Sequence, residues 1–298
     1  MKLVEWLDMW YNTYVMGSSL AVASQEMYRR SIEAVPAHLG RLDLCELTPV
    51  HLFIWLKQRA AETPRAAQLD RIMLQRALRT AAKCRLMDPI VLDDDTCPRI
   101  EHKAAPAVIL NADQVGVYIE HALRSPAAPL LLFCLCGLRR GEALGVRWQD
   151  VDLASGVLHV RGQRQRIRRQ YMYKELKTEK SKRSLQMPGI LWELLRRWPR
   201  DIRWDNSGTK RGTFVLDLSP EKLQKEHKKV LKSANLPPVT LHGLRHTFAT
   251  LAAAQGVPMK QLQMALGHSN YRITADLYAD HLSSLSSVQS LVFQRFVG

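Results

Sequence analysis

Residues 241–250 read LHGLRHTFAT and open a predicted helix, with His242 and Arg245 in its first turns. His242 and His246 are four residues apart, which is a spacing that zinc ligands use on a helix. Gly243, however, stands where a zinc protease carries the glutamate that acts as its base. The stretch therefore does not indicate a metal site, and its arginine and histidines need another explanation.

Three further segments carry residues of the same kinds. They are Gly137–Glu142 (GLRRGE), Lys177–Arg183 (KTEKSKR) and Leu266–Asn270 (LGHSN), and Tyr278 follows ten residues after His268. Two arginines, two histidines, a lysine and a tyrosine would line a site for an anion, because guanidinium groups bind a phosphodiester bidentately and stabilise its developing charge. A tyrosine beside such charge can lose its proton and attack phosphorus. A lysine whose pKa is lowered by cationic neighbours can protonate the leaving oxygen.

The net charge also indicates a polyanionic partner. The 298 residues carry a formal charge of +15, and 46% of them are hydrophobic, which is ordinary for a folded protein. Residues 1–105 have a net charge of only +1, whereas residues 161–183 carry +8 and residues 63–85 carry +5. Two short stretches thus hold most of the charge, and we expect both to face a polyanion, for which nucleic acid is the first candidate and an anionic membrane surface the second.

Several other classes of protein are excluded by what the sequence lacks. The longest apolar run, 130–138, is far too short to span a bilayer, and the acidic residues near the N-terminus do not fit a secretory signal. The five cysteines show no Cys-x-x-Cys pairing, which favours a reduced, cytoplasmic protein. Phosphate-binding loops and nucleophile-elbow motifs are missing as well, and we expect no cofactor.

The first hundred residues predict a helical bundle. Helices are expected from Leu3, over about 24–39, from Thr48-Pro49, and from Thr63-Pro64 to about Met87. In the last of these, we expect four residues to face the core, namely Leu69, Ile72, Met73 and Leu78. Its basic residues are candidates for contacts with DNA phosphates, namely Arg65, Arg71, Arg76, Arg79 and Lys83. A basic face that is simply solvated is the alternative.

The second part of the chain is predicted to be helical around a small sheet. Residues 93–106 lack the regular spacing of apolar residues that helices and strands show, and we interpret them as a linker between domains 1–92 and 107–298. Helices are expected at 111–124, 129–136, 188–198, 220–233, 242–255 and 258–266, and an amphipathic helix near the C-terminus carries Leu285, Val288, Leu291 and Val292. Side chains that alternate in the manner of β-strands between residues 157 and 187 predict an antiparallel sheet. The fold class is therefore mainly α with a small antiparallel β-sheet (α+β).

The segments quoted above resemble the boxes of the tyrosine recombinases, the phage integrase family. The matching residues are Arg139 with Glu142, Lys177, His242 with Arg245, His268 and Tyr278, in the family's order. The resemblance is close over 106–280 and looser over the helical first part, which is similar to a core-DNA-binding domain. It implies a Xer-like layout, without the arm-binding domain of larger integrases.

The resemblance implies a role for each matched residue. Arg139 and Arg245 would bind the scissile phosphate, and Tyr278 would attack it to form a 3′-phosphotyrosine without metal or ATP. Lys177 would be the general acid, with Lys180 or Lys182 as alternatives. The remaining roles are those of a general base for His242, a hydrogen-bond donor to the phosphate for His268, and an orienting carboxylate for Glu142.

Further expectations concern partners. Relatives act on paired recombination sites as tetramers through their C-terminal helices, sometimes with a DNA-bending accessory protein, and this implies a bacterial cytoplasmic, nucleoid-associated enzyme. The arginine-rich segment between the strands supplies more candidate DNA contacts, namely Arg164, Arg166, Arg168 and Arg169. Three alternatives remain: a type IB topoisomerase-like enzyme, a catalytically silent DNA-binding regulator and, more distantly, a metal-dependent nuclease.

Overall fold

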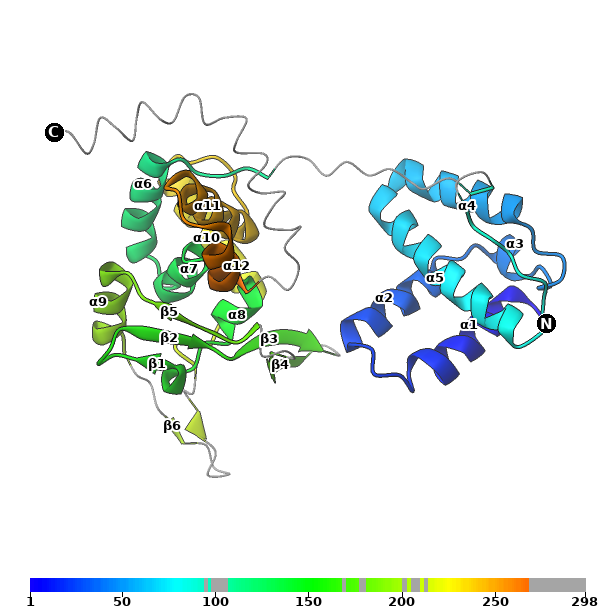
Figure 1. Ribbon diagram of the computed structural model, residues 1–298, viewed down its shortest axis with the longest axis horizontal. Coiled ribbons are helices and arrows are strands. Elements are labelled where there is room, and N and C mark those ends of the chain that lie inside the picture. Colours follow the sequence, from blue (N-terminus) through cyan, green and yellow to red (C-terminus); the bar gives the residue numbers. More distant parts are fainter. Residues whose placement is uncertain are drawn as a thin grey trace. The chain divides into compact units, whose positions relative to one another are not determined.

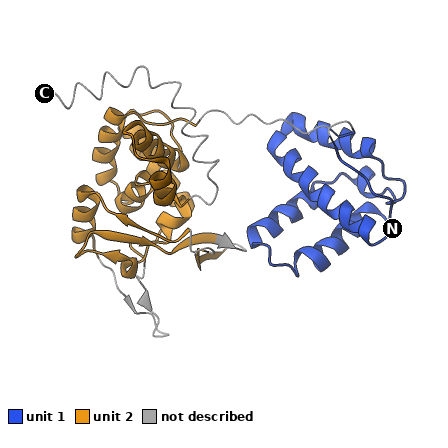
Figure 2. Cartoon of the chain, in the orientation of Figure 1, with its two compact units in different colours: residues 1–105 blue, residues 106–298 orange. Residues whose placement is uncertain are grey.

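The computed structural model describes residues 1–93, 96–97, 107–167, 170–176, 181–199, 203–204, 210–211 and 214–267. It divides into two compact units, Met1–Ala105 and Pro106–Gly298 (Figure 2). Several predicted features lie outside the described residues: most of the linker, Lys177, Lys180, Arg168, Arg169, His268, Tyr278 and the C-terminal helix. No helix of the described segments is long and apolar enough to cross a membrane.

The first unit is helical throughout its regular structure (Figure 1). Its elements are α1 (Leu3–Trp10), a π-helical turn (Tyr11–Val15), α2 (Val22–Glu33), α3 (Ala37–Gly40), α4 (Pro49–Glu62) and α5 (Pro64–Lys83). Leu3, Leu7 and Trp10 recur at helical spacing and are fully buried. The indole of Trp6 donates a hydrogen bond to the carbonyl of Ala77 at 3.1 Å, which ties α1 to α5.

The predicted helix over 24–39 is wrong in its second half. The chain leaves α2 after Glu33, and Pro36 then caps the separate short helix α3. Proline has no backbone N–H and disfavours the helical conformation of the residue before it, so the two helices cannot be continuous here. The neighbouring prediction at Thr48-Pro49 is confirmed, because the Thr48 hydroxyl accepts from the backbone N–H of His51.

Helix α5 buries Met73 and Leu78 as predicted, but it ends four residues early, at Lys83 rather than Met87. Ile72 is 49% exposed, although it was expected in the core, whereas Asp70 is buried. Asp70 takes an inward position because Arg59 from α4 donates to its carboxylate at 2.9 Å. The buried face of α5 is otherwise apolar, and the ion pair with Arg59 allows one carboxylate to lie on it.

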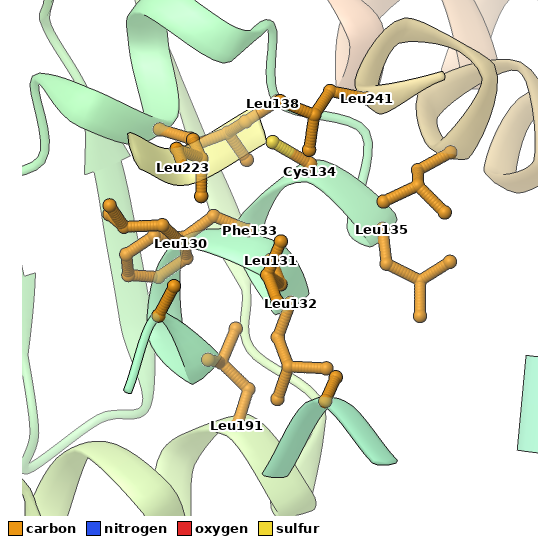
Figure 3. Packing of buried hydrophobic residues seen from close by; sticks show 14 of the residues in the cluster. Leu130, Leu131, Leu132, Phe133, Cys134, Leu135, Leu138, Leu191, Leu223 and Leu241 are labelled. Atoms are coloured by element: carbon orange, nitrogen blue, oxygen red, sulfur yellow. The ribbon is translucent and has the colours of Figure 1, made fainter. Parts of the chain in front are cut away.

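The second unit is built around α7 (Ala128–Leu135), whose eight residues are all buried. Figure 3 shows leucines from other parts of the chain, among them Leu191, Leu223 and Leu241, packed around it. The surrounding helices are α6 (Ala112–Leu123), α8 (Arg140–Leu144), α9 (Gly189–Arg197), α10 (Pro220–Ser233), α11 (Leu241–Ala254) and α12 (Met259–Leu266). The predicted ranges of α7, α9, α10, α11 and α12 agree with these bounds within one residue.

The predicted antiparallel sheet is confirmed, but it is divided. β1 (Val151–Asp152), β2 (Val157–Val160) and β5 (Arg183–Gln186) form one sheet in the order β1-β2-β5. β3 (Gly162–Ile167) and β4 (Gln170–Glu175) form a separate hairpin, and β6 (Arg203–Trp204) pairs with β7 (Lys210–Arg211). The register places Val160 opposite Arg183, so β5 begins beside the residue at which β2 ends.

The β3–β4 hairpin packs directly on α8 (Figure 1). A Cβ on Gly145 would lie 2.9 Å from the Cα of Gln163, and one on Gly141 would lie 3.1 Å from the carbonyl oxygen of Arg164. The two glycines, one helical turn apart, therefore allow the backbone of β3 to approach the helix closely.

Candidate active site

A tight turn at Gly137 leads into α8 and places Arg139 at its start. Gly137 has a φ of +90°, and a Cβ there would lie 2.9 Å from the ring of Phe248. Arg139 is the N-cap residue of α8. Its backbone N–H donates to Oε2 of Glu142 at 2.9 Å and its Nη1 donates to Oε1 at 2.7 Å. The helix start and the carboxylate thus fix the backbone and the guanidinium of Arg139 together.

Glu142 is completely buried and lies among three arginines, which with it form what we call the Glu142 cluster. Nη2 of Arg183 donates to its Oε2 at 2.8 Å, and Nη1 of Arg245 lies 3.8 Å from the same oxygen. Burial alone would raise the pKa of Glu142. The hydrogen bond and charge of Arg183, together with Arg139, outweigh burial and hold the pKa below its ordinary value. The carboxylate is therefore ionised and balances part of the positive charge.

Arg245 extends from α11 into the interior, where it is 2% exposed. Its Nη1 donates to the carbonyl of Gly137 at 2.6 Å and its Nη2 donates to that of Leu266 at 2.7 Å. Burial and the charge of Arg139 lower the pKa of Arg245 to about 9, so the side chain still carries its proton at neutral pH. Its nearness to Arg139 leaves a site with more positive charge than Glu142 neutralises.

The last carbonyls of α12 connect the three arginines. Ala265 accepts from Nε of Arg183 at 2.6 Å, Leu266 accepts from Arg245, and Gly267 accepts from Nη2 of Arg139 at 3.0 Å. Carbonyls at a helix C-terminus have no partner within the helix and carry the negative end of its dipole, which explains their affinity for cations. Gly267, in the left-handed conformation, ends α12 one residue before His268.

His242 and His246 lie against each other on the first turns of α11. Their ring centroids are 4.5 Å apart with the rings nearly perpendicular. Partial desolvation, with His246, Arg245 and Arg139 nearby, lowers the pKa of His242 to about 4. Burial and Arg245 lower the pKa of His246 as well, and its Nδ1 has no hydrogen-bond partner among the described residues. Both imidazoles are neutral at physiological pH, which leaves the ring of His242 able to accept a proton.

The structure thus brings Arg139, Glu142, His242 and Arg245 together. Among the described residues, no group of three or more His, Cys, Asp or Glu side chains lies in an arrangement that could hold a metal ion.

The hairpin that precedes residue 177 is held by a stack of side chains. The guanidinium of Arg147 lies 4.3 Å from the ring centroid of Tyr173, and the rings of Tyr173 and Phe214 are 6.1 Å apart. The guanidinium carbon of Arg164 lies 4.5 Å from the ring centroid of Phe214, and its Nη1 forms an ion pair with Oδ1 of Asp217 at 2.6 Å. Arg164, predicted to contact DNA, is therefore engaged within the unit, and nothing is described of the side chain of Arg166.

The candidate DNA-binding residues of α5 differ in their surroundings. Nη2 of Arg71 donates to the carbonyls of Leu92 at 2.6 Å and Cys97 at 3.0 Å, so this side chain ties α5 to the segment that follows it. Arg65 donates to Gln68, and Arg76 donates to the hydroxyl of Tyr28. Arg79 and Lys83 are exposed.

Arg183 was not singled out from the sequence as a site residue. It ends a run of lysines and arginines whose members look alike, and its partner Glu142 is 41 residues away in the sequence. A weak signal was available, because Arg183 begins the alternating strand pattern that leads to Leu185 and Met187.

Residues 99–284 match the profile of the Phage integrase family. The chain is 32% identical over 202 residues to a tyrosine recombinase XerC-like protein of Caldanaerobacter subterraneus, covering 60% of this chain and 52% of that protein. It is 27% identical over 252 residues to a putative prophage phiRv2 integrase of Mycobacterium tuberculosis, covering 81% of this chain and 66% of that protein. The chain therefore spans about half to two thirds of these relatives' length.

Solved structures show the same fold. The integrase of transposon Tn1549 in complex with a circular intermediate DNA superposes with a TM-score of 0.75 at 19% identity, covering 95% of this chain and 98% of that one. A lambda integrase tetramer bound to a Holliday junction gives a TM-score of 0.65 at 18% identity, covering 91% of this chain and 78% of that one.

Proposed function

Because the chain belongs to the phage integrase family, we propose that it is a site-specific DNA recombinase that cuts and rejoins strands through a covalent 3′-phosphotyrosine. The observation that carries this proposal is the Glu142 cluster. Arg139 and Arg245 come from separate helices and converge, with a net positive charge, where a phosphodiester would be bound. Such fixed donors stabilise the charge that develops as phosphorus is attacked.

The chemistry follows from groups in this chain. The hydroxyl oxygen of Tyr278 forms a bond to phosphorus, the bond to the 5′-oxygen breaks, and Lys177 gives that oxygen a proton. His242 takes the proton of the tyrosine, a role that suits its neutral imidazole, and His268 donates a hydrogen bond to the phosphate. A 5′-hydroxyl of a partner strand then attacks the phosphotyrosine. Each step exchanges one phosphate ester for another, so no ATP is consumed.

The proposed partners are two recombination sites in double-stranded DNA, bound by a tetramer. The lambda integrase tetramer on a Holliday junction supports this assembly for a protein of the same fold. Exchange between subunits would use the C-terminal helix, and an accessory DNA-bending protein would assist where sites must be brought together. The setting we propose is the nucleoid in the cytoplasm of a bacterial cell, during integration or excision of a mobile element.

Trapping of the covalent complex tests this function. The full chain is incubated with nicked duplexes made from DNA that flanks its gene, in detergent-stopped reactions with and without chelator. We expect a protein–DNA adduct in both, with a phosphotyrosine at Tyr278 in the digested complex. Tyr278→Phe should abolish the adduct. Tyr14→Phe, which changes an exposed tyrosine of the first unit, is the matched control and should retain it.

The other outcomes identify the alternatives. An adduct that survives Tyr278→Phe would reject the nucleophile. Relaxation of supercoiled plasmid by a monomer on any sequence would favour a topoisomerase-like enzyme, and binding with no cleavage of any nicked duplex would favour a regulator. Loss of cleavage in chelator would favour a metal-dependent nuclease.

A further inference from the structure

Arg183 is a third arginine of the Glu142 cluster, with no role in the chemistry described above. Its side chain is 6% exposed, compared with 37% for Arg139. Its Nη2 donates to Glu142 at 2.8 Å, its Nε donates to the carbonyl of Ala265 at 2.6 Å, and its Nη1 donates to that of Ser181 at 3.4 Å. All three nitrogens are thus directed to acceptors within the protein rather than to a substrate.

The contact with Glu142 has a consequence for Arg245. Oε2 of Glu142 accepts from Arg183 at 2.8 Å and from the backbone of Arg139 at 2.9 Å, while Arg245 stands 3.8 Å away. At that distance Arg245 keeps its bonds to the carbonyls of Gly137 and Leu266. Without Arg183, Oε2 of the buried carboxylate would lose its charged hydrogen-bond donor, and the attraction would draw Arg245 from its carbonyls towards Oε2.

The contact with α12 has a second consequence. Arg183 binds the carbonyl of Ala265, two residues before the carbonyl of Gly267 that holds Arg139. The space beside Gly267 is filled by Arg183, since a Cβ on this glycine would lie 2.9 Å from its Nη1. The position of Arg183 therefore fixes the end of α12 against which Arg139 rests.

We propose that Arg183 is a positioning residue, which holds Glu142 and the end of α12 so that Arg139 and Arg245 are presented to the scissile phosphate in one arrangement. The proposal rests on the proposed function. A lysine in its place keeps the charge but has no planar fork to reach three acceptors at once. Arg183→Lys and Arg183→Gln should therefore bind DNA as the unaltered chain does, but cleave it more slowly.

The test is single-turnover cleavage of a nicked duplex, with DNA affinity measured separately in a Tyr278→Phe background. Misplacement of a reacting group by about 1 Å costs about 10²-fold in rate, and we expect a loss of this order for Arg183→Lys. Arg59→Lys is the matched control, because it makes the same change beside a buried carboxylate, Asp70, in the other unit. It should lower the melting temperature and leave the cleavage rate unchanged.

A modified substrate separates positioning from a general loss of structure. A methylphosphonate at the scissile position lacks one charged non-bridging oxygen, so it depends less on correctly placed guanidinium groups. Arg183→Lys and Arg183→Gln should slow cleavage of this substrate much less than cleavage of the phosphate. Equal slowing of both substrates, or unchanged rates in both variants, would overturn the positioning role. Absence of an adduct with the unaltered chain would instead reject the proposed function.

Discussion

Exposed arginines of α5 and the buried arginines of the Glu142 cluster use the same side chain in different ways. On α5, Arg79 is exposed and Arg76 lies at the surface against Tyr28, whereas in the cluster Arg183 and Arg245 are almost fully enclosed. Whether an arginine is exposed or enclosed depends on whether an oxygen acceptor is buried near it. Glu142 and the end of α12 gather arginines inward, while α5 carries its one acidic residue, Asp70, on a face already paired with another helix. The number of arginines in a stretch therefore does not indicate which of them remain available to a phosphate.

The largest effect should follow from removing the acceptor. Glu142→Gln leaves buried arginines without their counter-charge, and breaking such a pair costs about 3–5 kcal/mol of unfolding free energy. Denaturant unfolding of the full chain, with hydrogen exchange to assign the transition to the second unit, measures it. Glu193→Gln is the control, since this exposed carboxylate pairs with Arg196 and Arg197 at the surface and should change stability by less than about 0.5 kcal/mol. Similar losses of stability in the two variants would show that the buried carboxylate among arginines stabilises the unit no more than an exposed one does.

Partial burial of His242, together with the positive charges near it, should also set the pH response of cleavage. Because the pKa of His242 is lowered to about 4, its neutral form persists as pH falls through the ordinary value of 6.5. The acid limb of kcat/KM, which reports the free enzyme, should lie near pH 4. His242→Gln should lower kcat/KM by about 10²-fold or more and remove this limb. An acid limb near pH 6.5 in the unaltered chain would show that neither burial nor the neighbouring cations lower the pKa of His242, or that His242 is not the base.

Two arginines on the same helix offer a sharper comparison. Arg71→Gln should lower stability by about 1–3 kcal/mol, because the carbonyls of Leu92 and Cys97 lose their donor, and it should leave the salt dependence of DNA binding unchanged. Arg79→Gln should do the reverse, with unchanged stability and a slope of log K against log salt reduced by about 1. Thermal melting and salt titrations of DNA binding measure both. A reduced slope for Arg71→Gln would mean that its internal bonds give way to DNA.

The smallest effect concerns a buried group that is not charged. His227 accepts from the hydroxyl of Tyr118, bonds the carbonyl of Val239, and has a pKa that burial lowers below 6.5. The unfolded chain therefore binds a proton that the native chain does not, and stability should fall as pH drops below 6.5. Glu142, whose lowered pKa lies below 4.5, should contribute only to the loss at still lower pH. His242 and His246, whose pKa values are lowered as well, contribute to the same loss below pH 6.5, so His227→Gln should reduce it without abolishing it. A pH dependence of stability that is the same in His227→Gln and in the unaltered chain would contradict this assignment.

Much of the fold was predictable because its signals are local. Asn111 and Gln114, for example, bond each other's backbone N–H at the start of α6, as the capping pattern indicates. The prediction of which residues of α5 are buried was partly wrong, because a contact with another helix contributes to it. Asp70 can lie on the buried face of α5 because Arg59 pairs with it, whereas Ile72, predicted to be in the core, is exposed.

The candidate site shows the same limit. Arg139, His242 and Arg245 were predicted from their motifs, and the structure brings them together. The predicted roles of Lys177, His268 and Tyr278 remain predictions. Arg183 was missed because its partners, Glu142 and the Ala265 carbonyl, are apparent only when the chain is folded. Short motifs therefore identify groups that face a substrate more readily than groups that hold them in place.

The glycine contact between α8 and β3 has a consequence for protein engineering. Because Gly141 and Gly145 carry no side chain, the backbone of β3 lies close to α8 at both positions. A hairpin taken from another protein, grafted alone to change the DNA preference, would have to reproduce the backbone path of β3 over this helix. Chimeras that take α8 and the hairpin from the same parent should therefore retain their folding more often than chimeras that exchange the hairpin alone.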